Sequence, residues 1–227
     1  MTMRAHRFPA VPSGKVEVAI DRRTLLLGAA GLTGAALMLR GAPAWAAPQV
    51  QQPAPDFSAV DSNGATHSLA ALRGKIVVLE WTNHDCPYVR KHYGANNMQN
   101  LQREVTGAGA VWLTVISSAQ GEQGHVPADQ ANTLTKSRNA APTAVLLDAK
   151  GTMGRAYSAQ TTPHMYVINQ QGMLVYMGGI DSIATTRAAD LQQAIPYLHD
   201  AFRAVMEGKP VQNAVTRPYG CSIKYSA

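Results

Sequence analysis

The sequence contains little cysteine, no glycine-rich phosphate loop and no apolar run long enough to cross a membrane. Cys86 and Cys221 are the only cysteines among 227 residues, and in an oxidising compartment such an even number favours a disulfide or a redox pair over metal binding. Without a phosphate-binding loop, we predict no cofactor. The apolar stretch at residues 25–39 is shorter than the roughly 20 residues of a membrane-spanning helix. We therefore expect no membrane span in the mature protein.

Charge is also scarce, and most of the basic excess lies near the N-terminus. The formal net charge is +6, but residues 1–46 hold six of the twenty Lys and Arg and two of the fourteen Asp and Glu. The rest of the chain has a net charge of only +2. This small excess argues against nucleic-acid binding.

Residues 1–46 have the three parts of a cleaved export signal. A charged segment ends at Arg22-Arg23, the apolar stretch follows, and Ala44-Trp45-Ala46 matches the A-x-A cleavage pattern. We expect the mature chain to begin near Ala47 and to be periplasmic or otherwise exported. The run at 21–27 resembles a twin-arginine signal, which leaves the export route open. An uncleaved N-terminal anchor is the alternative.

Apolar patterning in the mature chain predicts an α/β fold. Strands are expected at 57–60, 66–68, 76–81, 110–116, 144–147, 165–168 and 173–177. Helices are expected from Pro87, with a break near Gly94 to Asn97, and at 98–105, 129–138, 151–157 and 191–205, where Pro196 should bend or interrupt the last one. Alternating strands and helices imply parallel pairing, and the terminal hairpin makes the sheet mixed. We divide the chain into a signal (1–46), a linker (47–54), a domain (55–208) and a tail (209–227).

Cys86 stands where a buried strand gives way to a helix. There the sulfur would face unpaired backbone N–H groups and the positive end of the helix dipole, both of which favour the thiolate. Arg90, one helical turn on, adds a positive field, whereas Asp85 opposes it. A half-buried structural cysteine is the alternative interpretation of the same position.

Several separated motifs resemble those of one protein family. They are Trp81-Thr82-Asn83, Cys86-Pro87-Tyr88-Val89, Lys91-His92-Tyr93, Asn97-Met98-Gln99, Thr161-Thr162-Pro163-His164, Gly178-Gly179-Ile180-Asp181 and the tail from Pro218 to Tyr225. Together they resemble the thioredoxin-like superfamily, in its redoxin branch with the alkyl hydroperoxide reductase/thiol-specific antioxidant proteins, and an exported bacterial redoxin-like group within it. The resemblance covers about residues 54–225. It implies a thioredoxin-like fold, with helices on both faces of a mixed sheet, and thiol redox activity. A thiol or disulfide protein or a peroxide would be the partner, with an external thiol reductant.

Two departures from the family patterns bear on the activity. Thioredoxins have Cys-x-x-Cys, but here Val89 takes the second cysteine's position. Peroxiredoxins carry Pro seven residues and Thr or Ser three residues before the peroxidatic cysteine, and these positions are Leu79 and Asn83. We therefore favour disulfide exchange over peroxide reduction, and keep the peroxidase as the alternative.

Cys221 is the natural partner of Cys86 because no neighbouring thiol is present. The tail from Gly208 is long enough for Cys221 to reach Cys86, at about 3.3 Å per residue. Cys221 would then resolve a sulfenate or mixed disulfide on Cys86 as a Cys86–Cys221 disulfide. The alternative is a permanent structural disulfide in a non-catalytic binding module that uses the strand edge near Pro163.

The resemblance implies further site residues. Pro163 would be in the cis form beside the reactive sulfur, the Thr162 backbone would bind an incoming peptide, and His164 would be either an acid–base group or an exposed ring. Supporting positions are Trp81, Asn83, Pro87 and Arg90.

Two chemical possibilities remain beside the thiols. Glu80 interrupts an apolar strand; it could be a proton shuttle with a raised pKa, or a solvated or paired acid near the strand end. His84 and His92 with Cys86 do not have the spacing of a zinc site, and Arg90 removes a Cys-x-x-x-Cys copper motif. We predict no metal; a metal-delivery protein is a third, weaker hypothesis.

Overall fold

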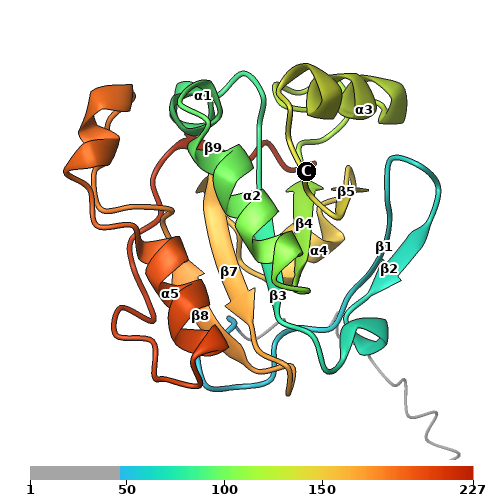
Figure 1. Ribbon diagram of the computed structural model, residues 1–227. Helices are drawn as coiled ribbons and strands as arrows, with labels where there is room; N and C mark the ends of the chain where they lie inside the picture. Colours follow the sequence, from blue (N-terminus) through green and yellow to red (C-terminus); the bar gives the residue numbers. More distant parts are fainter. Residues whose placement is uncertain (1–46, 227) are drawn as a thin grey trace, which may run out of the picture. The chain divides into compact units, whose positions relative to one another are not determined.

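A five-stranded mixed sheet in the order β5-β4-β3-β7-β8 forms the centre of the computed structural model, which describes residues 47–226 (Figure 1). The predicted signal and its cleavage site lie outside the described residues. Strands β3 (Val77–Trp81), β4 (Val111–Ile116) and β5 (Ala144–Leu147) are parallel, and β7 (His164–Ile168) and β8 (Leu174–Gly178) form an antiparallel hairpin. The predicted mixed sheet is confirmed.

The two central strands are buried along their whole length. All five residues of β3 and all six of β4 are buried, because helices cover both faces of the sheet. On one face Leu79 and Trp81 pack with Tyr157 and Tyr166; on the other Val78 packs with residues of the covering helices. This explains the near-continuous apolar runs in the sequence.

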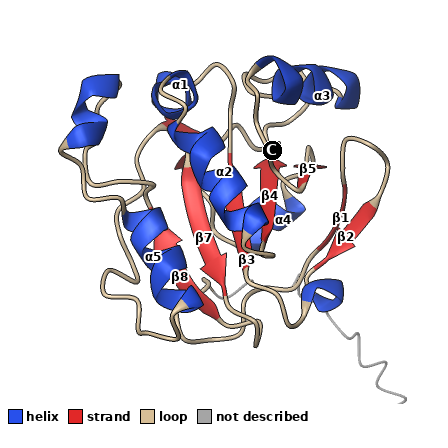
Figure 2. Ribbon diagram, viewed as in Figure 1, coloured by secondary structure: helices blue, strands red, loops and turns tan. Residues whose placement is uncertain are grey.

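Helices lie on both faces of the sheet (Figure 1). The face of Val78 carries α1 (Pro87–Gly94), α2 (Asn97–Gly107) and α5 (Tyr197–Met206), and α3 (Ala128–Ser137) packs at its β5 side. The face of Leu79 and Trp81 carries α4 (Thr152–Ala156) with the small hairpin of β1 (Ser58–Val60) and β2 (Thr66–Ser68). Figure 2 also shows the short helical turns, η1 (Ala70–Leu72) and η2 (Ala188–Gln192). Among residues 47–226, no helix is long and apolar enough to cross a membrane.

Local sequence signals fix two helix boundaries. Asn96 takes a left-handed conformation, with φ of 57°, and separates α1 from α2 where the break is predicted. Pro196 caps the start of α5, so the predicted last helix is interrupted there and its first part is η2.

Two backbone pairings of the observed fold are absent from the sequence prediction. The segment predicted as a linker runs along the β7–β8 hairpin, where the Gln51 N–H donates to the Leu174 carbonyl at 2.7 Å and Ala54 N–H to the Gly172 carbonyl at 3.0 Å. Two residues of the tail form a strand, β9 (Cys221–Ser222), which pairs with β6 (Thr161–Thr162). Neither pairing has a local sequence signal.

Candidate active site

Cys86 caps the N-terminus of α1, as the sequence predicts. It has extended backbone angles, Pro87 is the first helical residue, and the Arg90 N–H donates to the Cys86 carbonyl at 2.9 Å. The Asn83 carbonyl accepts the Cys86 N–H at 3.1 Å, and the Asn83 Oδ1 accepts the Asp85 N–H at 2.9 Å. A tight loop after β3 thus places Cys86 at the start of α1.

The Cys86 sulfur is enclosed by the segment before Pro163. Cys86 is fully buried, and its thiol donates to the Thr162 carbonyl at 3.0 Å. The Thr162–Pro163 peptide bond is cis, which confirms the form that the family resemblance implies. Residues 76 positions apart in the sequence therefore meet at the sulfur.

The tail places Cys221 directly on this site. Thr162 pairs with Cys221 in the antiparallel β6–β9 ladder, and the Thr162 hydroxyl donates to the Cys221 carbonyl at 3.4 Å. The Cys221 N–H donates to the Cys86 Sγ, 3.4 Å away. Both cysteines are free thiols in this structure, Cys86 buried and Cys221 partly exposed. The predicted Cys86–Cys221 disulfide itself stays a prediction.

Gly220 makes the close approach of the tail possible. Its φ is +143°, and a Cβ on this residue would lie 1.9 Å from the Thr162 carbonyl oxygen. Only glycine combines this conformation with such close backbone contact.

Aromatic residues on both sides of Cys221 hold the tail. The Tyr219 hydroxyl donates to Asp181, and its ring packs edge-on against Tyr88 at 5.7 Å between centroids. On the other side, the Tyr225 hydroxyl donates to the Ala159 carbonyl at 2.8 Å. The cysteine therefore sits in a segment that is anchored at both ends.

The Tyr219 anchor rests on a buried ion pair. Lys91 Nζ lies 3.1 Å from Asp181 Oδ2 and also donates to the Ile183 carbonyl at 2.9 Å. His92 Nε2 lies 3.3 Å from the Tyr219 hydroxyl, and burial lowers the pKa of His92 to about 4. The imidazole is therefore neutral near pH 7, and the Lys91 ammonium balances the Asp181 carboxylate.

The pKa values of the two thiols are shifted in opposite directions. Burial raises the pKa of the Cys86 thiol, but hydrogen bonds from the Cys221 side chain and from the N–H groups of Val89 and Cys221 outweigh it, so the pKa lies below its ordinary value. Burial and the neighbouring Cys86 raise the pKa of Cys221 to about 12. Of the pair, Cys86 is the more acidic thiol and Cys221 the less acidic one.

Comparison with known proteins agrees with this geometry. The family model described as the AhpC/TSA family matches residues 50–177, more than half of the chain. The chain belongs to the AhpC/TSA family. It is thus a redoxin, in general terms a thiol oxidoreductase. The curated proteins give no significant match.

Solved structures show that this AhpC/TSA protein has the thioredoxin-like fold. A hypothetical protein from Sinorhizobium meliloti 1021 superposes with a TM-score of 0.66 at 22% identity, over 80% of this chain and 97% of that one. An uncharacterized conserved protein from Geobacillus kaustophilus gives 0.68 at 21%, over 78% and 93%. A Bacteroides thetaiotaomicron protein provisionally assigned as a protein disulfide isomerase gives 0.51 at 17%, over 71% and 94%.

The residues predicted to support the site divide into loop and core positions. Asn83 and Pro87 shape the loop and helix start around Cys86, as described above. Arg90 does not contact the sulfur; its guanidinium donates to the His84 carbonyl at 3.2 Å and pairs with Asp85 at 3.0 Å. Trp81 is a core residue, fully buried, whose indole N–H donates to Ser117 Oγ at 3.0 Å.

His164 is not the exposed ring that was one of the two sequence interpretations. It is 6% exposed, and its Nδ1 lies 3.3 Å from the Gln160 nitrogen and 3.2 Å from the Tyr166 hydroxyl oxygen. Burial lowers its pKa to about 4, so the ring is neutral near pH 7. An acid–base role for His164 stays a prediction.

Within residues 47–226, Glu80 is neither solvated nor paired with a cation, which corrects the simpler of its two interpretations. It is fully buried and accepts hydrogen bonds from neutral groups only: Tyr93 Oη at 2.8 Å, Trp112 Nε1 at 2.9 Å, Thr114 Oγ1 at 3.0 Å and Gln102 Nε2 at 3.2 Å. Burial raises the pKa of this carboxyl, and the four hydrogen bonds only partly offset it. A proton-shuttle role for Glu80 stays a prediction.

Sequence reasoning missed the residues that hold the tail. Lys91, His92, Asp181 and Tyr219 lie within the family motifs, but no spacing rule brings them together. Among residues 47–226, no group of three or more His, Cys, Asp or Glu side chains is placed to hold a metal ion.

Proposed function

We propose that this protein is an exported thiol–disulfide oxidoreductase in which Cys86 is the nucleophile and Cys221 the resolving thiol. One observation carries the proposal: the β6–β9 pairing holds Cys221 beside the Cys86 sulfur, with the Cys221 backbone N–H 3.4 Å from the Cys86 Sγ. The lowered pKa of Cys86 suits it to be the nucleophile, and the raised pKa of Cys221 suits it to keep its proton until it resolves the mixed disulfide.

In the proposed reaction the Cys86 thiolate attacks one sulfur of a substrate disulfide. A mixed disulfide forms, and the other substrate sulfur leaves as a thiolate. Cys221 then loses its proton to that thiolate and attacks the Cys86 sulfur, which forms the Cys86–Cys221 disulfide and releases the second substrate thiol. The substrate has gained two electrons from the two cysteines, one proton from Cys221 and one from water, which had received the proton of Cys86 when that thiol ionised.

Two features support attack by the external reductant at Cys221. Its sulfur is on the partly exposed residue, whereas Cys86 is fully buried. The leaving group would be the Cys86 thiolate, the more stable of the two, and a thiol of low pKa leaves faster. A dithiol reductant would complete the cycle by expelling the Cys221 sulfur as a thiol.

The tail also limits which substrate reaches Cys86. The backbone edge at Thr162, where the family resemblance places an incoming peptide, is paired with Cys221. A protein disulfide must therefore displace the tail, whereas a small molecule needs only a local opening.

Redox titration with thiol trapping tests the proposal. Reduction of the Cys86–Cys221 bond in the folded protein at a moderate potential, and accumulation of a mixed disulfide with Cys221→Ser, are the expected results. A bond that resists reduction until the protein unfolds would point instead to a structural disulfide in a binding module.

A thiol peroxidase is the second candidate, and membership of the AhpC/TSA family favours it. Cys86 would attack the peroxide oxygen, giving the alcohol or water and a Cys86 sulfenic acid, which condenses with Cys221 to the disulfide and water. Leu79 and Asn83 in place of the peroxiredoxin Pro and Thr or Ser oppose it. Stopped-flow peroxide consumption decides: equal rates for the wild type and Cys86→Ser would exclude this activity.

Export is part of the proposal and is tested separately. Intact mass and N-terminal sequencing of the protein recovered from the periplasm should give a chain that begins near Ala47. A full-length chain in the cytoplasmic fraction would contradict it.

A further inference from the structure

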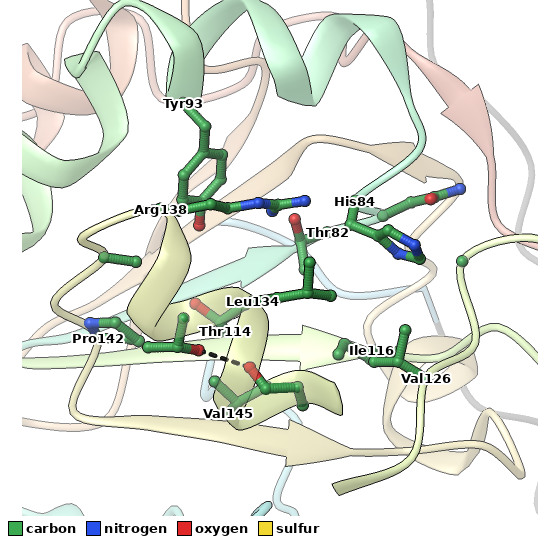
Figure 3. A pocket seen from close by; sticks show the side chains of 15 residues that line it. Thr82, His84, Tyr93, Thr114, Ile116, Val126, Leu134, Arg138, Pro142 and Val145 are labelled. Carbon is green, nitrogen blue, oxygen red and sulfur yellow. Dashed lines mark hydrogen bonds between the residues drawn. The ribbon is translucent and has the colours of Figure 1, made fainter. Parts of the chain in front are cut away.

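Two hollows near the reactive loop differ greatly in size. The pocket between α3 and the carboxyl ends of β3 and β4, drawn in Figure 3, has a volume of about 30 Å³, which is room for one or two water molecules. A groove along the tail has a volume of about 630 Å³, within the usual range for sites of small molecules. Of the two, only the groove has room for a reactant.

The groove reaches the immediate neighbours of Cys221. One wall is the tail from residue 213 to residue 220, and another includes Tyr88 on α1. Thr161 of β6, the strand that pairs with the strand of Cys221, also lines the groove. A molecule bound there therefore lies beside the partly exposed thiol of the pair.

The tail restricts the size of the reactant. Thr162 pairs with Cys221, so the backbone edge that would bind a substrate peptide is already occupied. The Tyr219 hydroxyl donates to buried Asp181, and the Tyr225 hydroxyl holds the tail on the other side of Cys221. A polypeptide would have to break these contacts, whereas a small molecule in the groove leaves them intact. The arrangement favours a small molecule as the external reductant.

The charges around Cys221 favour an anion. Arg217 lines the groove and is exposed, and within residues 47–226 it forms no ion pair and donates no side-chain hydrogen bond. Lys224 is exposed too, and its ammonium lowers the pKa of Cys221 against the stronger effect of burial. Asp181, the only acid of the described chain that lines the groove, is buried and paired with Lys91. The tail at 209–227 contains no Asp or Glu. A carboxylate is therefore attracted to this end of the molecule.

We propose that the groove binds a small monothiol that carries a carboxylate, and that this thiol reduces the Cys86–Cys221 disulfide. The inference rests on the proposed thiol–disulfide function and names its reductant. The carboxylate lies near Arg217, and the thiolate attacks the Cys221 sulfur, which expels the Cys86 thiolate and leaves the small molecule in a mixed disulfide on Cys221.

A second molecule of the same thiol completes the reduction. Its thiolate attacks the small molecule's sulfur in the mixed disulfide, and Cys221 leaves as a thiolate beside the Lys224 ammonium and takes a proton. The two monothiols lose two electrons and two protons and become one small disulfide. The electrons go to the two cysteine sulfurs, one proton goes to Cys221, and the other goes to Cys86 or to water. Two monothiols thus do the work of one dithiol.

Reduction kinetics of the oxidised full chain with a matched pair of thiols test the proposal. N-acetylcysteine carries a carboxylate, and N-acetylcysteine amide is the same molecule with a neutral amide in its place. At equal thiolate concentration, the acid should reduce the Cys86–Cys221 bond about three- to fivefold faster than the amide. High salt should remove this advantage, because the cations are exposed. Equal rates for the two thiols would overturn the inference and leave the proposed function standing. If neither thiol reduces the bond in the folded protein, both fail.

Charge variants locate the site. Arg217→Gln should slow N-acetylcysteine about threefold and leave the rate of the amide unchanged. Lys209→Gln is the matched control, because it removes one positive charge from the same tail, but Lys209 pairs with Glu207 and does not line the groove. Equal slowing of the acid by both variants would mean that only the overall charge matters, and would overturn the site. If Arg217→Gln slows reduction by a thioredoxin-type protein but not by N-acetylcysteine, the groove serves a protein reductant and the proposal is wrong.

Discussion

The backbone N–H of Cys221 meets the Sγ of Cys86 at 3.4 Å, although 135 positions separate the two residues in the chain. This contact brings the tail residue that carries the second thiol of the proposed pair to the Cys86 sulfur. The position of the second cysteine of a Cys-x-x-Cys protein is Val89 on α1, which is fully buried. The tail thus carries the second thiol of the proposed pair, because α1 has no second cysteine.

The first prediction concerns the acidity of Cys86. Cys221→Ala removes the side-chain hydrogen bond to the Cys86 sulfur, so the pKa of Cys86 should rise and its thiolate fraction at pH 7 should fall. Ultraviolet thiolate absorbance during a pH titration measures this. Cys86→Ala, which leaves only Cys221, separates the two signals. An unchanged Cys86 titration in Cys221→Ala would mean that the backbone N–H groups of Val89 and of residue 221 lower the pKa without the Cys221 thiol.

The second prediction concerns the close contact between the tail at Gly220 and the Thr162 carbonyl. Gly220→Ala would place a Cβ on the Thr162 carbonyl, so the tail should undock, and alkylation of Cys86 should become at least tenfold faster, which corresponds to about 1.4 kcal/mol. The rate of thiol alkylation under native conditions is the measurement. Gly208→Ala is the matched control, because Gly208 has a φ of +66° but nothing within 4 Å of its Cβ position. Equal rates in both variants would show that the tail does not cover the sulfur in solution.

The third prediction concerns the Tyr219 anchor. Tyr219→Phe removes the hydrogen bond to the buried Asp181, which should loosen the tail and slow formation of the Cys86–Cys221 disulfide several-fold. Hydrogen exchange of the tail and the oxidation rate with a small disulfide report the two effects. Tyr197→Phe, at a half-buried residue on α5, should leave both unchanged. If hydrogen exchange of the tail becomes faster in Tyr219→Phe but disulfide formation does not slow, then Tyr219 anchors the tail without positioning Cys221 for the reaction.

The fourth prediction is a loss of stability in mild acid. The pKa of His164 is about 4 in the folded protein, below the ordinary value of 6.5, because burial disfavours the charged ring. The unfolded chain therefore binds the proton more readily. The contribution is complete above pH 6.5, is lost as the pH falls toward 4, and amounts to about 3 kcal/mol. Urea unfolding of the wild type and His164→Asn at pH 7 and pH 5 should show a smaller loss in the variant. Equal losses would contradict the assignment.

The fifth prediction has the opposite sign and concerns Glu80. Its pKa in the folded protein is raised, so its contribution to stability is complete below the ordinary value of 4.5 and declines as the pH rises through the raised pKa. Glu80→Gln, which keeps an acceptor for the surrounding donors, should gain stability relative to the wild type as the pH rises. Glu80→Ala leaves those donors unpaired and should cost roughly 3 kcal/mol or more. Denaturant unfolding at pH 4 and pH 8 compares the three proteins; parallel pH profiles for the wild type and Glu80→Gln would refute the effect.

Local signals made much of the fold predictable. The buried runs of β3 and β4, the helix start at Pro87 and the interruption at Pro196 all follow from residues within a few positions of each other. The strand-to-helix position of Cys86 is equally local. The family motifs added the cis form of Pro163, which single-residue statistics do not favour.

The sequence by itself determined that Cys86 caps a helix after a buried strand, because steric and hydrogen-bonding preferences act over short stretches of chain. Only the tertiary structure decided the burial of Glu80 among neutral donors and the Lys91–Asp181–Tyr219 anchor. It also decided that Cys221 pairs with Thr162. These contacts join segments far apart in the chain, and their free energies depend on burial and close approach, which no residue spacing encodes.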